Sequence, residues 1–219
     1  MINQLELTEV KKTLNNYYLT ILDYSNQILK KIETTSYDSA KLKQLVEHDL
    51  IIDREHYNLT EDYIWFIAKK RPLALDLRRI IAYILIIKEL ERVSDGFKNV
   101  AKNILSNNCP PSGIHKYVAP FYKKIVHQFE DLSKTLTKYD LDTLKKISAQ
   151  HMIINQEYHK IASELNHQTV KSTSESEVAL LTSYIVCLKN LERTDDHLVN
   201  ICEEINYIYE GTHQIDNEK

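Results

Sequence analysis

Glycine, proline and cysteine are scarce in this chain. Its 219 residues include only 3 Gly and 4 Pro, which leaves little material for the tight turns that sheets and barrels need. The sequence therefore predicts an all-α fold. The 3 cysteines are widely spaced and form no CxxC pair of the kind that zinc sites and redox dithiols use. We expect Cys109, Cys187 and Cys202 to be small buried residues in a reducing cytosol.

Charge of one sign and long apolar runs are missing too. The net charge is only -3, and no run of Lys and Arg marks a track for a phosphate backbone, so we expect no nucleic-acid partner. The longest apolar run, residues 80–87, is far too short to cross a bilayer. The first residues, MINQLELTEVKK, lack the cationic and apolar regions of a signal peptide. The chain is expected to be cytoplasmic and to meet a membrane only through partner proteins.

Signatures of catalysis are absent as well. The sequence has no P-loop, no serine flanked by glycines and no His-Glu-x-x-His pair. We therefore expect no enzymatic activity of these classes. With 43% hydrophobic and 27% charged residues, the chain can bury a substantial core. Trp65, its one tryptophan, is expected to belong to that core.

Turn residues divide the sequence into six helical segments. Asp38 and Asp140 each precede a helical pattern, where a carboxylate can accept hydrogen bonds from free amides of the first turn. Arg71-Pro72 interrupts a long pattern, and the segment 107–113 is the one strong linker. The expected helices cover about 3–32, 38–70, 73–105, 115–138, 140–169 and 175–210.

The chain also contains an internal repeat. Shifted by 101 residues, segment 83–104 aligns without a gap on segment 184–205, with nine identities in 22 positions, where chance would give about one or two. The repeat predicts two tandem, pseudo-symmetric three-helix bundles with short connections. We place them at 1–108 and 114–211, followed by a C-terminal tail at 212–219.

The repeated segment carries two pairs of carboxylates. Glu91 and Asp95 stand one helical turn apart, as do Glu192 and Asp196. Both pairs lie roughly opposite an apolar stripe that recurs with helical periodicity. A solvated helix face, with Arg92 balancing part of the charge, is the simplest interpretation of one such pair. Two pairs at equivalent positions favour a second hypothesis, an acidic surface that binds metal ions.

Further oxygen ligands lie near these pairs. Asn99 and Asn200 continue the acidic face by one turn, and the second copy adds Glu203. Asp49 and Asp53 are again four residues apart, in the helix expected to pack antiparallel to the one that bears Glu91. Carboxylates and carboxamides are the hard ligands that Mg, Mn, Ca and Fe ions prefer.

These residues together resemble the PhoU family of phosphate-uptake regulators. The resemblance rests on DLIID at 49–53, the junction KKRPLALDLRRI at 69–80, LERVSDGFKN at 90–99 and LERTDDHLVNICEEI at 191–205. It implies a PhoU-like fold of two three-helix bundles and no catalysed reaction. It also implies multinuclear clusters of divalent or trivalent metal ions, such as Fe, Zn, Mn or Mg. Carried over by position, the ligands would be Asp49, Asp53, Glu91, Asp95, Glu192 and Asp196.

The resemblance further implies a regulatory role and partners. Members of the family act as cytoplasmic negative regulators of phosphate uptake and of phosphate-starvation signalling, and they are commonly dimers. Their partners would be the ATPase subunit of the phosphate ABC transporter and a phosphate-sensing histidine kinase.

The second half departs from the family pattern. Where a second Asp-x-x-x-Asp is expected, the sequence has His151 and Asn155, so this site should hold fewer ions or hold them more weakly. The alternative for His151 is a structural role as an amphipathic residue on a partly buried helix. The usual glycine of the repeated motif is Ser94 in one copy and Asp195 in the other. The helical angle of Asp195 points it nearer the core than the ligand face.

Two other classes of protein stay open at this point. A carboxylate-bridged di-metal oxidase or storage protein would need two Glu-x-x-His motifs inside one bundle. Only Glu164 with His167 and Glu210 with His213 have that spacing, and neither shares a segment with the repeat. The remaining alternative is a helical adaptor that binds no metal.

Overall fold

The computed structural model describes residues 4–34 and 36–215, and within these ranges it contains helices and no strands. The all-α prediction of two tandem, pseudo-symmetric three-helix bundles is confirmed. The ends of the chain, residues 1–3 and 216–219 of the expected units, lie outside the described residues. In chain order the elements are α1 (Gln4–Ile32), α2 (Ser39–Lys70), α3 (Leu75–Ser106), α4 (Pro111–Gly113), the π-helical turn η1 (Ile114–Val118), α5 (Ala119–Thr137), α6 (Leu141–Lys171) and α7 (Glu175–Glu210).

The helix starts follow the local chemistry of the sequence. The Asp38 carboxylate accepts from the backbone amides of Ala40 and Lys41, and this caps α2. The Asp140 carboxylate caps α6 in the same way. The fourth helical segment begins at Pro111, four residues earlier than expected, because a proline suits the first helical turn, where its missing N–H is not needed.

The junction between α2 and α3 contains two residues with positive φ, and α3 begins two residues later than predicted. Arg71 ends α2 in the left-handed conformation with φ 49°, and its N–H donates to the Ile67 carbonyl at 2.9 Å. Ala74 also has φ 49°. Because a residue with positive φ cannot continue a right-handed helix, α3 begins at Leu75 and not at residue 73.

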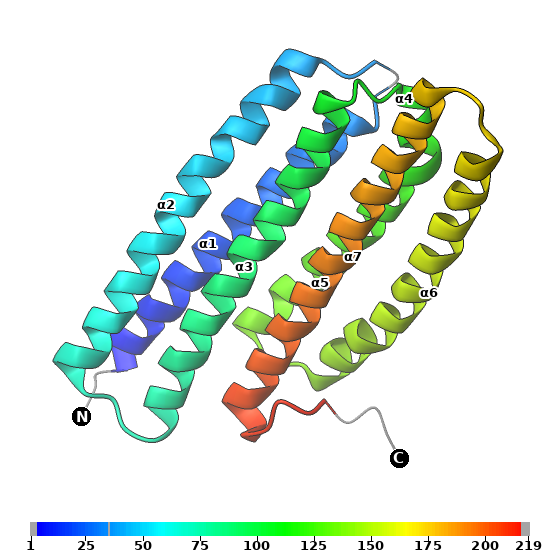
Figure 1. The fold of residues 1–219 in the computed structure, drawn as a ribbon. Helices are drawn as coiled ribbons and strands as arrows, with labels where there is room; N and C mark the ends of the chain where they lie inside the picture. Colours follow the sequence, from blue (N-terminus) through cyan, green and yellow to red (C-terminus); the bar gives the residue numbers. More distant parts are fainter. Residues whose placement is uncertain (1–3, 35, 216–219) are drawn as a thin grey trace.

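The two bundles lie side by side, with α3 and α7 next to each other between them (Figure 1). The helices α3 and α7 pack against each other more extensively than any other pair of the described elements. The helices α1 and α5 lie behind them, while α2 and α6 form the two outer edges of the molecule (Figure 1). Gly96 allows the close approach of α3 and α7, because a Cβ at this position would lie 1.9 Å from the Thr194 Oγ1. The repeated motifs therefore face each other across the centre.

The two bundles share one apolar core. Tyr18 of α1, Phe97 of α3, and Tyr122 and Phe129 of α5 are buried together. The ring centroids of Phe97 and Tyr122 are 4.8 Å apart, and those of Tyr18 and Phe129 are 4.3 Å apart. Aromatic rings at such distances favour tilted packing of this kind. The core thus fixes α1 and α3 of the first bundle against α5 of the second.

Trp65 does not belong to this core, and the prediction that it would was wrong. Its side chain is 62% exposed on α2, and the Lys69 ammonium lies 4.4 Å from the centre of its ring. Among the described residues, no helix is long and apolar enough to span a membrane.

Candidate metal centre

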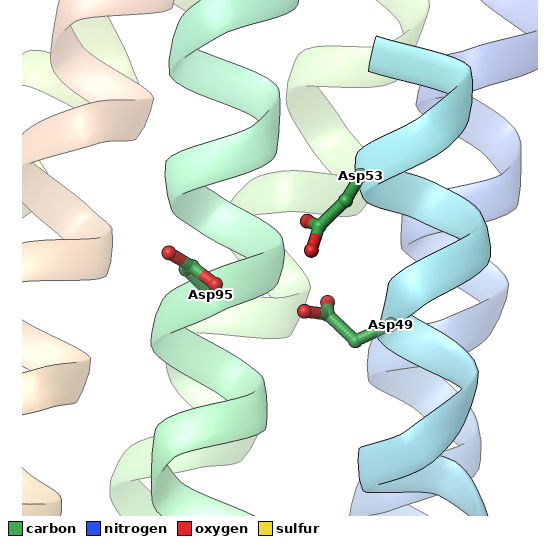
Figure 2. Close-up of side chains that lie close together, drawn as sticks. All are labelled: Asp49, Asp53 and Asp95. Atoms are coloured by element: carbon green, nitrogen blue, oxygen red, sulfur yellow. The ribbon is translucent and has the colours of Figure 1, made fainter. Parts of the chain in front are cut away.

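Three carboxylates meet between α2 and α3. Asp49 and Asp53 project from successive turns of α2, and Asp95 comes from the facing turn of α3 (Figure 2). Their ligand oxygens all lie within 4.8 Å of one another. Within the described part of the chain, no other set of three or more Asp, Glu, His or Cys side chains brings its ligand atoms so close. The structure thus brings together the three aspartates that the sequence assigned to the first-half site.

The innermost member of this cluster is held by two donors. Asp49 is only 2% exposed. The Ser94 hydroxyl donates to Asp49 Oδ1 at 2.7 Å, and the Lys98 ammonium donates to Asp49 Oδ2 at 2.5 Å. Lys98 also donates to Asp95. Burial alone would lower the pKa of Lys98, but the hydrogen bonds to both aspartates outweigh it and raise that pKa. Lys98 is therefore an internal cation within the cluster.

One lysine does not neutralise all of the negative charge. Burial and the neighbouring Asp95, Asp53 and Asp49 raise the pKa of Glu91. Burial, with Asp49 next, also raises the pKa of Asp53. The negative charge of the cluster also acts on the hydroxyls of Tyr17 and Tyr24. Burial is the larger cause of their raised pKa values, and the carboxylates raise them further. The carboxylates repel one another, and a bound cation would relieve that repulsion.

The residues present therefore fit a hard metal ion. All the clustered ligand atoms are carboxylate oxygens, which suits Mg, Mn, Ca or Fe ions better than soft ones. Asp53 and Asp95 are half-buried and so are within reach of solvent. Glu91 lies one turn before Asp95 on α3, on the rim of the same cluster.

The second half arranges its charges differently. The Nδ1–H of His151 on α6 donates to Asp195 Oδ2 on α7 at 2.8 Å, and Asp195 is fully buried. The expectation that Asp195 points toward the core is confirmed. The hydrogen bond between the two side chains raises the pKa of His151. Burial raises the pKa of Asp195. The Nε2 of His151 faces Asp196, whose Oδ1 is 3.9 Å away.

This arrangement exchanges the roles of the two helices. In the first half the buried carboxylate, Asp49, is on the outer helix and its partner Ser94 is on the central helix. In the second half the buried carboxylate, Asp195, is on the central helix. Glu192 is held by Lys189 at 2.5 Å. His151, Asp196 and Glu192 do not form a close set of ligand atoms as the three aspartates do.

The remaining candidate ligands have varied surroundings. The Asn200 amide donates to Glu89 Oε2 of α3 at 2.9 Å, and His197 Nδ1 lies 2.7 Å from the same oxygen. Asn200 thus ties α7 to α3. Asn155 has a buried Oδ1 with no hydrogen-bond partner among the described residues. Glu203 is half-buried on α7.

A polar groove separates the two halves of this surface. It has a volume of about 400 Å³ and runs between α3 and α7. Glu91, Asp95 and Asn99 line one side, and Arg193 and His197 line the other. Asn99 was predicted from the sequence as a ligand, whereas the contacts of Lys98, Ser94 and Glu89 were not predicted. Lys98 had a signal in the sequence, because it stands one turn after Asp95.

The two Glu-x-x-His pairs are not assembled into one site. Glu164 lies in the last third of α6 and Glu210 ends α7, and because these helices are antiparallel the two residues sit at opposite ends of the molecule (Figure 1). His213 pairs with Glu204 at 3.4 Å and stacks on Tyr207.

A duplicated six-helix bundle with a cluster of carboxylates on its surface defines a class of tandem helical-repeat proteins. Comparison with known families identifies the class. The PhoU domain model matches residues 20–104 and 121–205, so the chain belongs to the PhoU family. Proteins of this family are regulatory accessory proteins and not enzymes, and this agrees with the expectation from the sequence.

Individual relatives support the assignment. The chain is 26% identical over 208 residues to the phosphate-specific transport system accessory protein PhoU homolog 1 of Thermotoga maritima, covering 94% of this chain and 88% of that protein. It is 29% identical over 178 residues to a PhoU homolog of Rhizobium meliloti, covering 80% and 73%. It is 25% identical over 177 residues to PhoU of Escherichia coli K12, covering 80% and 72%.

Solved structures show the same fold. The crystal structure of PhoU from Pseudomonas aeruginosa superposes with a TM-score of 0.85 at 23% identity, covering 95% of this chain and 99% of that one. The phosphate transport system regulatory protein PhoU from Streptococcus pneumoniae gives a TM-score of 0.80 at 20% identity, covering 96% and 98%.

Proposed function

We propose that this chain is a cytoplasmic accessory protein that restrains phosphate uptake and phosphate-starvation signalling. The observation that carries the proposal is the match of the PhoU domain to both halves of the chain. The names of the relatives, which place them with the phosphate-specific transport system, support the same role. Its partners would be the ATPase subunit of the phosphate ABC transporter and a phosphate-sensing histidine kinase, and we expect it to act as a dimer.

We further propose that Asp49, Asp53 and Asp95, with Glu91 at the rim, hold one or more metal ions. A bound divalent or trivalent ion would supply positive charge that neutralises the cluster. The support is the approach of their oxygens within 4.8 Å and the raised pKa values of Glu91 and Asp53. The side chain of Ser94 orients Asp49 by its hydrogen bond. The aspartates, which come from both helices, connect α2 to α3 at this point.

The second half should bind metal more weakly. Its outer helix offers one imidazole and one carboxamide in place of two carboxylates, and Asp195 is occupied by His151. Asp196 and Glu192 are the carboxylates that remain near His151. Glu203 on α7 and the carbonyl of Asn155 on α6 are the other oxygen ligands predicted for this half.

The regulatory role is tested in a host that lacks its own copy of the chain. Wild-type protein should restore repression of phosphate uptake at high external phosphate, and tagged protein should retain the transporter ATPase in a pull-down. Uptake that stays derepressed, with no ATPase retained, would contradict the proposal.

The metal site is tested separately by elemental analysis of protein purified without chelator or metal-affinity steps. We expect bound metal in the wild type and its loss in an Asp53→Asn, Asp95→Asn variant. Asp62→Asn, an exposed aspartate on the same helix, is the matched control. Equal metal content in all three proteins would exclude the site.

A further inference from the structure

A cavity of about 560 Å³ lies between α5 and α6. Its volume falls within the range of about 300–1,000 Å³ that is usual for small-molecule sites. Ile153 and Ile154 of α6 form an apolar wall, and two amides come from Gln128 of α5 and Gln150 of α6. The other lining residues carry titratable groups and are Lys124, His127, Asp131, Lys146 and Glu157. An apolar wall beside a few polar groups is the usual lining of a site for a small organic molecule.

The carboxamide of Gln128 is incompletely paired inside the protein. Gln128 is only 4% exposed, and its buried Oε1 accepts no hydrogen bond from the part of the chain that the structure describes. Buried polar atoms are normally paired, because an unpaired one has lost its hydration without compensation. Since Gln128 lines the cavity, a ligand that donates a hydrogen bond to this oxygen would satisfy it.

The duplicated fold shows which residue of the first half corresponds to Gln128. The Tyr18 hydroxyl of α1 donates to the Phe129 carbonyl of α5. In the reverse direction, the Tyr122 hydroxyl of α5 donates to the Ser25 carbonyl of α1. The repeat thus relates these two bonds, with the two tyrosines equivalent and the two acceptors equivalent. Residues of α1 and α5 therefore correspond at a shift of 104 positions.

The place of the cavity is filled by aromatic rings in the first half. At the shift of 104, Gln128 corresponds to Tyr24. On α6, Gln150 corresponds to His48, since each directly precedes the Asp-x-x-x-Asp pattern or its altered copy. The rings of Tyr24 and His48 are stacked, with centroids 6.3 Å apart and planes inclined by 21°. The second half replaces both rings by amides, and α5 packs less extensively on α6 than α1 does on α2. The cavity therefore lies where the first half holds a pair of stacked rings.

The charges around the cavity leave one lysine in excess. Asp131 is shared by two lysines, with Lys134 at 2.9 Å and Lys146 at 3.0 Å. Lys124 is paired with Glu157 at 2.5 Å, so these two charges balance. The end of the cavity at Lys146 is therefore net positive and favours an anionic group.

We propose that this cavity binds an adenine nucleotide, with the base between α5 and α6 and the phosphate at Lys146. A planar ring against Ile153 and Ile154 would take the place of the stacked rings of the first half. Adenine presents an N–H donor beside a ring-nitrogen acceptor on one edge, and these match the two ends of a glutamine amide. The base would thus donate to the Oε1 of Gln128. One ligand accounts for the apolar wall, the unpaired oxygen and the excess lysine.

The cavity is separate from the carboxylate cluster. It lies between α5 and α6, whereas Asp49, Asp53 and Asp95 lie between α2 and α3 (Figures 1 and 2). Nucleotide binding therefore depends neither on the proposed metal site nor on the proposed role in phosphate regulation. All binding measurements use chelator-treated protein without added metal, so that a phosphate cannot bind through a metal ion at the cluster.

The first experiment is a calorimetric titration of the full chain with adenosine monophosphate (AMP). We expect saturable binding at one site per chain. Guanosine monophosphate should bind about tenfold more weakly, because the guanine edge that carries N7 presents a second acceptor in place of the donor. Adenosine should bind more weakly than AMP because it lacks the phosphate. Inorganic phosphate alone should not displace AMP.

Two single variants separate the base from the phosphate. Gln128→Leu removes the amide at similar size and should weaken AMP binding about tenfold. Gln156→Leu makes the same change at an exposed position of α6 outside the cavity, and it should bind AMP as the wild type does. Lys146→Gln should weaken AMP binding about threefold, as for an exposed charge pair, and should leave adenosine binding unchanged.

A double variant fills the cavity with the rings of the first half. Gln128→Tyr with Gln150→His rebuilds the stack of Tyr24 and His48, and this protein should no longer bind AMP. AMP should raise the melting temperature of the wild type, because a ligand of the folded state stabilises it, and should not raise that of the double variant. Melting curves without ligand show that each variant is folded. If Gln128→Leu is not folded, the double variant and Lys146→Gln decide.

Four results would overturn the proposal. The first is a wild type that shows no saturable binding of AMP. The second is undiminished binding by folded Gln128→Leu or by the folded double variant. The third is displacement of AMP by an equal concentration of inorganic phosphate, which would reduce the site to its lysines. The fourth is equal affinity for guanosine monophosphate, which would exclude recognition of adenine.

Discussion

The imidazole of His151 donates to the fully buried carboxylate of Asp195 at 2.8 Å, at the place where the first half pairs Ser94 with Asp49. The buried carboxylate of this pair therefore lies on the outer helix α2 in the first half and on the central helix α7 in the second half. His151 and Asn155 replace both carboxylates of the outer helix, and the carboxylate of Asp195 on the central helix is used to hold His151. This difference explains why the described part of the chain has one cluster of aspartates and not two.

Restoring the first-half pattern should create a stronger second site. A variant with His151→Asp and Asp195→Ser is expected to bind metal about tenfold more tightly in its second half, because tenfold or more is a common effect of ligand and partner changes. Titration with Mn²⁺ or Zn²⁺, followed by calorimetry, measures this. Asp195→Ser alone is the control: it leaves the half-buried imidazole of His151 without its partner and should lower the free energy of unfolding by about 1–3 kcal/mol. Unchanged affinity in the double variant would contradict the interpretation.

Lys98 should matter most when metal is absent. In chelator-treated protein, Lys98→Met removes the ammonium that donates to Asp49, and we expect a loss of about 3 kcal/mol in the free energy of unfolding. Added metal should restore most of that loss and should stabilise this variant more than the wild type, because the ion takes over the role of the ammonium.

Thermal unfolding with and without metal tests the exchange between lysine and metal. Lys102→Met, one turn later and exposed, should change little under either condition. A Lys98→Met protein that gains no more from metal than the wild type would show that the cluster does not bind a cation.

Gly96 should be required for the contact between α3 and α7. Gly96→Ala places a methyl group against Thr194 Oγ1, and we expect the free energy of unfolding to fall by about 1–3 kcal/mol. In a Thr194→Ala background the same change should be neutral or stabilising, because alanine favours a helix over glycine by about 1 kcal/mol. Chemical denaturation of the two single variants and the double variant gives the coupling. Additive effects would mean that the helices can shift apart at no cost.

Glu89 should make stability depend on pH. Burial alone would raise the pKa of Glu89, but hydrogen bonds from His197 and Asn200 outweigh it and lower that pKa below its ordinary value of 4.5. The charged form is therefore favoured in the folded state. Its contribution is fully present above the unfolded-state pKa and is lost as the pH falls through the lower folded-state pKa.

Glu89→Gln should accordingly lower the free energy of unfolding near pH 7 by about 1–2 kcal/mol, as expected for hydrogen bonds to a charged group. The difference from wild type should shrink below pH 4.5. Denaturant titrations at a series of pH values measure it. A difference that is the same at every pH would show that the charge of Glu89 is not involved.

Turn residues in the sequence were sufficient to predict the six helices, and the alignment of segments 83–104 and 184–205 predicted the duplication. Helical periodicity predicted the apolar stripe opposite Glu91 and Asp95, which is buried in the structure. It also predicted that Asp195 faces the core. These features depend on residues of one helix relative to one another, which a spacing of 3.6 residues per turn determines. The capping aspartates belong to the same kind of local chemistry.

Contacts between helices could not be predicted in this way. Periodicity does not give the rotation and the offset of one helix against its neighbour, and these decide whether Lys98 enters the cluster of aspartates or remains in solvent. The same reason explains why Trp65 was wrongly predicted to lie in the core. Its apolar character can be read from the sequence, but the packing of α2 against α1 and α3 determines that its side chain points outward.

The sequence by itself determined that the chain is a duplicated helical protein with carboxylates at equivalent places, because these properties follow from local spacing and from the repeat. Only the tertiary structure decided which of the predicted carboxylates meet, that His151 is held by Asp195, and that Trp65 is exposed on α2. Those facts depend on distances between side chains that are far apart in the sequence, and the packing of the shared core sets these distances.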